Sequence, residues 1–172
     1  PDGANLDCAI AISGTAETVA FSADCVSDAA FETARAGFVV LHPVVGVAGQ
    51  PVTVCHGDGS VEHAHWPERI EPWQPFMDIA AITHQVAPGV SAVTEFVGDI
   101  FEMEDQRNWT DGSYKTYVRP LARPWPYRIA QHEPFSQKIL VEIRSVGEAG
   151  FAKDASDAVT LMLARTDRHF PE

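Results

Sequence analysis

The sequence predicts an all-β protein built as one antiparallel β-sandwich. Apolar residues recur with a period of two over most of the chain, which is typical of strands with one buried face. Helical signals are few: only 27–35 and 149–159 suggest short helices, and neither carries an apolar stripe at 3.6-residue spacing. The chain has 172 residues, of which 45% are hydrophobic and 21% charged, as expected for one globular domain.

The first half of the chain predicts five strands. The segments 8–13 and 18–26 alternate between apolar and small or polar residues. The segment 37–42 is a continuous apolar run, which predicts a strand buried on both faces. Segments 51–56 and 60–65 flank Gly-Asp-Gly, whose glycines supply the positive φ angles of a tight turn, and they are therefore expected to form a β-hairpin.

The second half predicts strands at 90–97, 100–104, 137–144 and 158–164. The segment 78–86 precedes the turn Ala-Pro-Gly. The run 106–117 is polar and aromatic, and four prolines between positions 120 and 134 predict an extended connection. About ten short strands separated by turns favour an antiparallel sandwich.

Charge excludes one class of partner. Asp and Glu number 24 against 12 Lys and Arg, so the net charge is −12. Such a chain repels phosphate backbones, and the only loose group of arginines, Arg119, Arg123 and Arg128, is broken up by prolines. We therefore expect no nucleic-acid partner. We also expect no membrane association, because no apolar run reaches the roughly 20 residues of a membrane span.

The three cysteines favour a reducing compartment. Their number is odd and no Cys-x-x-Cys pair occurs, which disfavours a disulfide framework or a structural zinc site. Cys8 and Cys25 lie in apolar alternating runs and are expected to be small buried side chains. No signal peptide is visible, so we expect a cytoplasmic protein. The chain lacks an initiator Met, which suggests a fragment or a processed chain.

The densest polar run of the chain, 102–115, is the candidate ligand-binding or domain-interface site. Alternation along the strand places Glu102 and Glu104 on one face, opposite Phe101, Met103 and Asp105. The candidate residues are Glu102, Glu104, Asp105, Arg107, Asn108, Trp109, Asp111 and Lys115.

Two interpretations of this run remain open. Trp109 could stack on the CH face of a sugar while carboxylates and Asn108 bind its hydroxyls, and two carboxylates about 5 to 9 Å apart could act as an acid/base pair. Alternatively, Arg107 clamps Glu104 or Asp105 and the run closes a structural corner at a sheet edge. No catalytic residue can be assigned from the sequence.

The histidines do not predict a metal site. His63 and His65 share a strand face, but no acidic ligand at suitable spacing completes a set, so we expect no metal and no cofactor. His42 ends an apolar strand, where a core histidine is expected rather than a metal ligand. His84 could be either a core histidine or a ligand. The motifs of serine hydrolases, P-loops and dinucleotide-binding folds are absent.

One stretch resembles a known family. Residues 102–117 read EMEDQRNWTDGSYKTY, which is similar to a stretch in the N-terminal domain of D-apionate lactonase-like proteins; Gly112 and Tyr114 stand where that family has Ala and Phe. Three further pieces fit in the same order, RAGFVVLHP at 35–43, WQPFMDI at 73–79 and PLARPWPY at 120–127. The resemblance covers roughly residues 31 to 145.

The resemblance implies a β-sandwich, for which the galactose-mutarotase-like supersandwich is one candidate form, followed after residue 172 by a TIM-barrel domain that carries catalysis. Residues 1–172 would then be one accessory domain of a bacterial sugar-lactone hydrolase, with the barrel and a sugar or sugar lactone as partners, and not catalytic alone. Two alternatives remain: a stand-alone carbohydrate-binding module, or a mutarotase- or epimerase-like enzyme using His42 or His84 with Glu104. A truncated sandwich is also expected to self-associate through exposed apolar surface.

Overall fold

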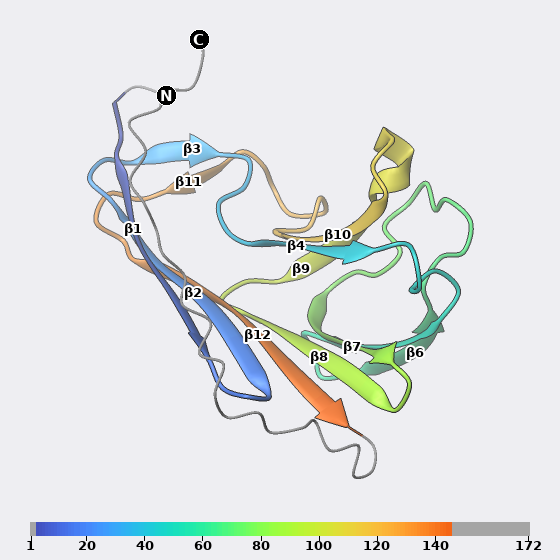
Figure 1. Cartoon of the computed structure of the whole chain (residues 1–172). Helices are drawn as coiled ribbons and strands as arrows, with labels where there is room; N and C mark the ends of the chain where they lie inside the picture. Colours follow the sequence, from blue (N-terminus) through green and yellow to red (C-terminus); the bar gives the residue numbers. More distant parts are fainter. Residues whose placement is uncertain (1–2, 146–172) are drawn as a thin grey trace, which may run out of the picture.

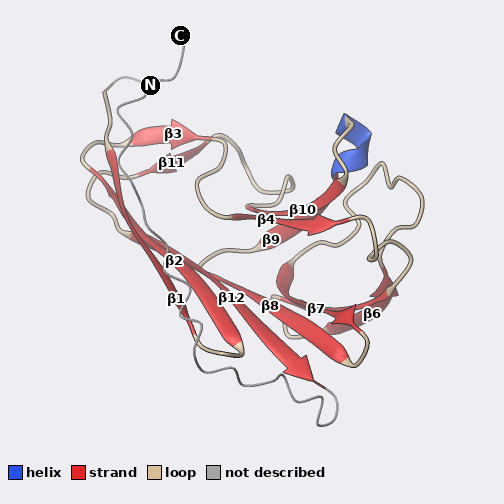
Figure 2. Cartoon of the chain, viewed as in Figure 1, coloured by secondary structure: helices blue, strands red, loops and turns tan. Residues whose placement is uncertain are grey.

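The computed structural model describes residues 3–145. A single 3₁₀ helix, η1 (Gln106–Trp109), joins two of the strands, and none of the described residues forms a helix long and apolar enough to cross a membrane (Figure 2). The strands are β1 (Leu6–Gly14), β2 (Thr18–Ser27), β3 (Phe31–Thr33), β4 (Val39–Pro43), β5 (Pro51–His56), β6 (Val61–His65), β7 (Ile79–Ala87), β8 (Val90–Val97), β9 (Phe101–Asp105), β10 (Ser113–Val118), β11 (Tyr127–Ile129) and β12 (Phe135–Ser145).

Most strands belong to one strongly curled sheet. Its order is β1-β2-β12-β8-β7-β9-β10-β4, with the β5–β6 hairpin attached to β7, and a separate ribbon pairs β3 with β11. All of these pairings are antiparallel. Figure 1 shows that the sheet curls so that β4, β9 and β10 face the layer that contains β8 and β7. The all-β antiparallel prediction is confirmed, and its two layers are parts of one sheet.

Trp66 lies at the centre of the core. Its side chain is 1% exposed, and aromatic or imidazole rings surround it at centroid distances of 5.0 to 6.1 Å: Tyr114, His42, His84 and Phe76. Aliphatic side chains from β5, β7 and β9 complete the cluster. Packing between the two parts of the curl therefore depends on this indole, because rings in such contacts add to the burial of apolar surface.

Two predicted elements differ from the structure. The segment 27–35 contains no helix but strand β3, which is stabilised by pairing with the distant β11. Strand β4 is buried on one face only: His42 is 5% exposed, whereas Val39 and Leu41 on the other face are 52% and 60% exposed. Within residues 3–145 it also forms an edge of the sheet, where it pairs with β10. The predicted helix 149–159 and strand 158–164 lie outside the described residues.

The expectation of unpaired cysteines at 8 and 25 is wrong. β1 pairs with β2 in a register that places Cys8 directly opposite Cys25, with their Cα atoms 4.2 Å apart, and the two form a disulfide. Cys8 is exposed rather than buried, because both faces of β1 are open. Cross-strand register decides this pairing, and cysteine spacing in the sequence does not reveal it. Cys55 is a free thiol.

Candidate functional site

Strand β9 distributes the carboxylates of the 102–115 run over its two faces. Asp105 points inward with the buried Phe101 and Met103, whereas Glu102 and Glu104 lie on the opposite face. The predicted alternation is confirmed. The run therefore contributes to two different environments, one on each side of the sheet.

On the inner face, Asp105 and Arg107 build a structural corner. The Asp105 carboxylate is 0% exposed, and the Arg107 guanidinium donates to it from Nη2 at 2.7 Å and from Nε at 2.9 Å. The same guanidinium donates to the carbonyl oxygens of Pro67, Glu68 and Arg69. Burial favours a higher pKa for Asp105, but the hydrogen bonds from Arg107 and from the backbone of Glu71 hold that pKa below its usual value.

The short helix η1 extends this corner. Asp105 caps it by accepting from the Arg107 backbone N–H at 3.1 Å. Asn108 then donates from Nδ2 to the carbonyl oxygen of Glu71 at 2.6 Å, and Thr110 ends the helix in the left-handed region at φ 67°. These contacts fix the loop that follows Trp66 against the end of β9. Asp105, Arg107 and Asn108 therefore form the structural corner that the second interpretation of the run expected.

On the outer face, Glu104 is the centre of a polar cluster. It accepts from Lys115 Nζ and from Trp109 Nε1, each at 2.7 Å. Burial favours a higher pKa for Glu104, but these two hydrogen bonds and the charge of Lys115 lower it below the usual value. The indole of Trp109 is thereby held in place although its side chain is 69% exposed.

Two further side chains enlarge this cluster. The Lys115 ammonium lies 5.4 Å from the ring centroid of Tyr117, and the guanidinium of Arg35, from the β3–β4 connection, lies 4.7 Å from it. Arg35, Glu104, Lys115 and Tyr117 line a shallow cavity of about 270 Å³. We refer to Arg35, Glu104, Trp109, Lys115 and Tyr117 as the Glu104 face.

Glu102 is buried beneath the Glu104 face, where it binds the hydroxyl of Tyr117. Its side chain is 2% exposed, and it accepts from the Tyr117 hydroxyl at 2.5 Å and from the Leu121 backbone N–H at 3.2 Å. Burial and the hydrogen bond to Glu102 raise the pKa of Tyr117. Because the Glu102 carboxylate is enclosed by these donors, the accessible groups of the face are one paired carboxylate, two cations and one indole. Such a set suits the binding of a polar molecule with an apolar face.

Comparison with known proteins identifies the family. A family model described as "D-apionate lactonase, N-terminal domain" matches residues 1–146. The chain belongs to this family. A D-apionate lactonase from Brucella anthropi is 47% identical over 173 residues, a match that covers 99% of this chain and 28% of that protein. The chain therefore spans little more than a quarter of the length of this relative.

A solved structure shows a weaker likeness to this D-apionate lactonase N-terminal domain. A putative aldose 1-epimerase from Escherichia coli K12 matches 82% of this chain and 61% of its own, with a TM-score of 0.47 and 10% sequence identity. Similarity at this level does not extend to function.

The histidines of this family member do not form the catalytic pair with Glu104 that one alternative required. His42 is opposite Tyr114 on the inner face, 5% exposed, and its Nε2 lies 3.0 Å from the Thr116 hydroxyl. Glu104 lies on the other face of the sheet. Burial and the neighbouring His84 lower the pKa of His42 to about 4, and burial also lowers the pKa of His84. His42 is a core imidazole, and His84 is half-buried beside Trp66.

The other predicted site residues divide between the two faces. Lys115 and Trp109 join Glu104, as described, whereas Asp111 is exposed and its backbone N–H bonds the carbonyl of Gln106 at 3.1 Å. Residues 3–145 contain no group of three or more potential metal ligands. Sequence reasoning missed Arg35 and Tyr117. Tyr117 shares the strand parity of Lys115, which is a usable signal, but nothing local reveals Arg35.

Proposed function

We propose that residues 1–172 form the single, non-catalytic N-terminal β-sandwich domain of a D-apionate lactonase-like sugar-lactone hydrolase. Membership of the family supports this proposal, and so does the Brucella anthropi relative, whose name states its activity. Because the chain spans 28% of that relative, we expect catalysis to reside in the remaining part, in a TIM-barrel domain that follows residue 172.

The Glu104 face carries the functional part of the proposal. Trp109 is 69% exposed, yet the hydrogen bond from its indole N–H to Glu104 fixes its orientation, so most of the ring is left open to a partner. An ordered exposed indole is typical of sugar platforms and of interface anchors. We therefore assign the Glu104 face to one wall of the sugar-lactone site or to the surface that holds the catalytic domain.

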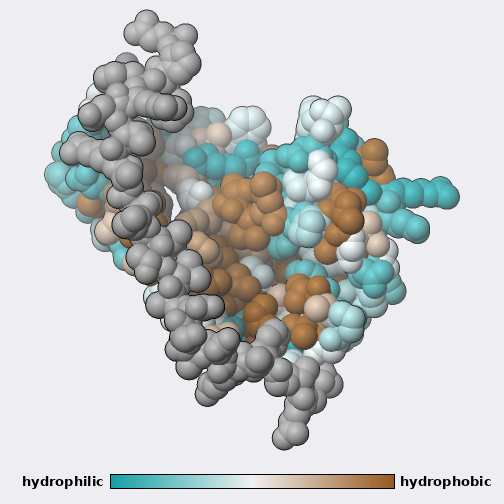
Figure 3. Space-filling model, in the orientation of Figure 1, coloured by the Kyte–Doolittle hydropathy of each residue, from teal (hydrophilic) through white to brown (hydrophobic). Residues whose placement is uncertain are grey.

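Exposed apolar side chains support the need for a further domain. Val39 and Leu41 lie on the same side of the sheet as Glu104 and Lys115, because Lys115 is directly opposite Leu41. Figure 3 shows apolar side chains gathered on the face of the molecule in view. Apolar residues that border a polar cluster in this way are typical of surfaces that bind another protein part.

The test is lactone hydrolysis by the full polypeptide that the gene encodes. We expect Trp109→Ala to lower kcat/KM for the lactone by roughly tenfold or more, since loss of a well-packed indole contact costs more than 1 kcal/mol at an interface. Trp73, which is 76% exposed, provides the matched control, and Trp73→Ala should leave the rate unchanged. Equal rates for wild type, Trp109→Ala and Arg35→Ala would refute the assignment.

The second candidate function is a stand-alone carbohydrate-binding module. The observation that favours it is the cavity of about 270 Å³, which is lined by Glu104, the residue that holds the exposed Trp109. The gene sequence beyond Glu172 separates the two functions: an alternating strand–helix continuation of roughly 250 residues supports the lactonase domain, whereas a stop codon supports the binding module.

We further propose that the protein is bacterial and cytoplasmic. The bacterial relative supports the first part. The redox state of Cys8 and Cys25 in the cell tests the cytoplasmic location, because a reducing cytoplasm keeps such pairs as thiols. Alkylation of living cells before lysis should label both cysteines if the proposal is correct, and recovery of an unlabelled disulfide would place the protein in an oxidising compartment.

A further inference from the structure

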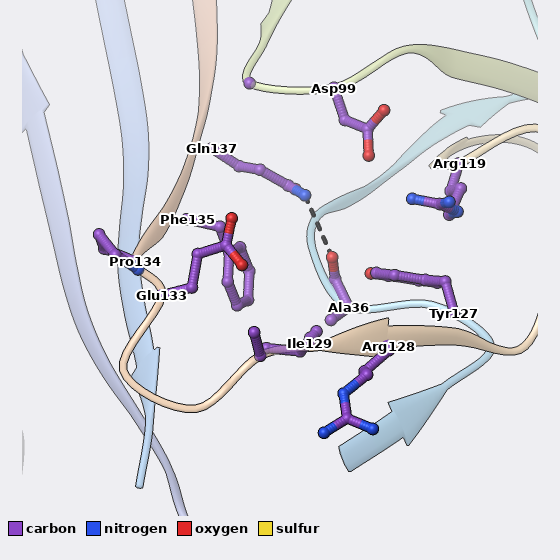
Figure 4. A pocket seen from close by; sticks show the side chains of 12 residues that line it. Ala36, Asp99, Arg119, Tyr127, Arg128, Ile129, Glu133, Pro134, Phe135 and Gln137 are labelled. Atoms are coloured by element: carbon purple, nitrogen blue, oxygen red, sulfur yellow. Dashed lines mark hydrogen bonds between the residues drawn. The ribbon is translucent and has the colours of Figure 1, made fainter. Parts of the chain in front are cut away.

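A second cavity shares no residue with the Glu104 face. Its volume is about 210 Å³, and its walls come from the turn between β8 and β9, the end of β10, strand β11 and the start of β12. The residues that matter for its chemistry are Asp99, Arg119, Tyr127, Glu133, Phe135 and Gln137. Figure 4 shows Asp99, Arg119, Tyr127 and Gln137 arranged around one side of this cavity.

Arg119 is held rigidly at the wall of the cavity. Its backbone adopts the left-handed region at φ 67°, and its N–H donates to the carbonyl of Ile100 at 3.0 Å. Its guanidinium carbon lies 3.8 Å from the centroid of the Tyr127 ring. A stacked guanidinium keeps its in-plane N–H donors free for another partner. The strained backbone and the stacked ring thus orient a cation whose donors remain open.

The charge of Arg119 has no counterion among residues 3–145. None of their carboxylates lies within the 4 Å of an ion pair with it; the arginines that do form such pairs there are Arg107, Arg123 and Arg144. Its Nε is buried and has no hydrogen-bond partner within the same residues. Asp99, which also lines the cavity, accepts instead from Arg123 at 2.8 Å and from the Ile100 N–H at 2.7 Å.

An unpaired, oriented guanidinium in a cavity is suited to a carboxylate, which matches its planar fork. The remaining walls define the rest of the ligand. The carboxylates of Asp99 and Glu133 are acceptors for hydroxyl groups, whereas Gln137 is already occupied by the Phe38 N–H and the Ala36 carbonyl. Phe135 supplies an apolar wall.

The size and the charge of the cavity limit which ligands it can bind. A cavity of about 210 Å³ is below the roughly 300 Å³ at which pockets for drug-sized molecules begin, so it suits a molecule of a few carbons. The carboxylates of Asp99 and Glu133 offset the two arginines that line the cavity, Arg119 and the exposed Arg128, so the site has no net positive charge to attract a phosphate dianion. We propose that this cavity binds a small hydroxy acid, with its single carboxylate on Arg119 and its hydroxyls on Asp99 and Glu133.

Isothermal titration calorimetry of the full polypeptide with sodium D-erythronate tests the proposal. We expect a binding event that Arg119→Gln weakens about tenfold or more, because a charge-assisted hydrogen bond to an ionised group is lost. Arg144→Gln is the matched control: it removes the same charge from the far end of β12, where Arg144 pairs with Glu142, and should leave the affinity unchanged. Arg119→Lys keeps the charge without the fork and should bind with intermediate affinity.

Three further titrations identify the groups that are recognised. Erythritol lacks the carboxylate and should not bind, acetate lacks the hydroxyls and should bind more weakly than erythronate, and inorganic phosphate should bind more weakly still. Equal affinity of wild type and Arg119→Gln, or tighter binding of erythritol or phosphate than of erythronate, would overturn the proposal. Lactone hydrolysis is measured separately on the same variants, so failure of this site is distinguishable from failure of the proposed function.

Discussion

Asp105 and Arg107 are only two residues apart, yet their ion pair joins segments of the chain that are distant in sequence. The Asp105 carboxylate is completely buried and contacts Arg107 at 2.7 Å, while Arg107 also binds the carbonyl of Pro67, 40 residues earlier. The pair thus anchors the loop after Trp66 to the end of β9. The stretch 102–117, which carries the resemblance to the family, is therefore partly a structural element. Its outer face, the Glu104 face, is the part that is open to a partner.

Arg107→Ala should destabilise the domain strongly. The substitution leaves a buried carboxylate without its cation and three backbone carbonyls without a donor. Removal of one partner from a buried ion pair costs roughly 3 to 5 kcal/mol. Urea unfolding should show this loss as a lower midpoint with an unchanged slope.

The control for this experiment is Arg144→Ala. Arg144 also pairs with a carboxylate at 2.7 Å, that of Glu142, but the two side chains are 56% and 36% exposed. Exposed pairs contribute little to stability, so the midpoint should stay close to that of the wild type. Equal midpoints for wild type and Arg107→Ala would show that the corner does not hold the fold together.

Strand positions with regular alternation were predictable from the sequence. β2, the β5–β6 hairpin, β8 and β12 all follow from local periodicity and turn residues. Strands β3 and β11 were not predictable in this way. Each has only three residues, and the two strands stabilise each other although they are about a hundred positions apart in the sequence. The exposure of β4 was mispredicted for a related reason: a continuous apolar run indicates a buried strand but not which strand closes the sheet.

The candidate site was predictable only where it is local. Alternation along the strand predicted that Glu102 and Glu104 lie on one face. The short separation of Asp105 and Arg107 in the sequence made an ion pair between them one of the expected possibilities. Arg35 reaches the Glu104 face from a connection that was predicted to be helical, and Arg119 is oriented by a ring beyond the intervening prolines. Such placements depend on tertiary pairing, and a single sequence carries no local signal for them.

The Cys8–Cys25 disulfide predicts a specific thiol count. In the purified, air-oxidised protein only Cys55 should react with a thiol reagent, and full reduction should expose three thiols. Loss of the crosslink, which spans 17 residues, should lower the free energy of unfolding by about 3 kcal/mol. Mass spectrometry after alkylation measures the count, and three reactive thiols in the unreduced protein would contradict the pairing.

The isolated 172-residue chain should self-associate through the edge of β4. Val39 and Leu41 are exposed there beside backbone groups that have no strand partner within residues 3–145, and edges of this kind promote association. Replacing Leu41 by Lys should shift the scattering mass towards the 18.7 kDa monomer. Val45→Lys is the control, because Val45 is 92% exposed but lies outside any strand. A wild-type chain that is a monodisperse monomer would contradict this prediction.

His42 should make the stability of the domain depend on pH between about 7 and 4. Its pKa falls from 6.5 to about 4 on folding, because the buried imidazole is poorly solvated. In this range the unfolded chain binds a proton that the folded chain does not, so the free energy of unfolding decreases as the pH falls, by roughly 3 kcal/mol in total. His42→Gln should remove this part of the slope, whereas the exposed His65→Gln should not. Urea unfolding at pH 7, 5.5 and 4.5 measures the slopes. Identical slopes for wild type and His42→Gln would mean that His42 is protonated in the folded state and that the core around Trp66 admits water.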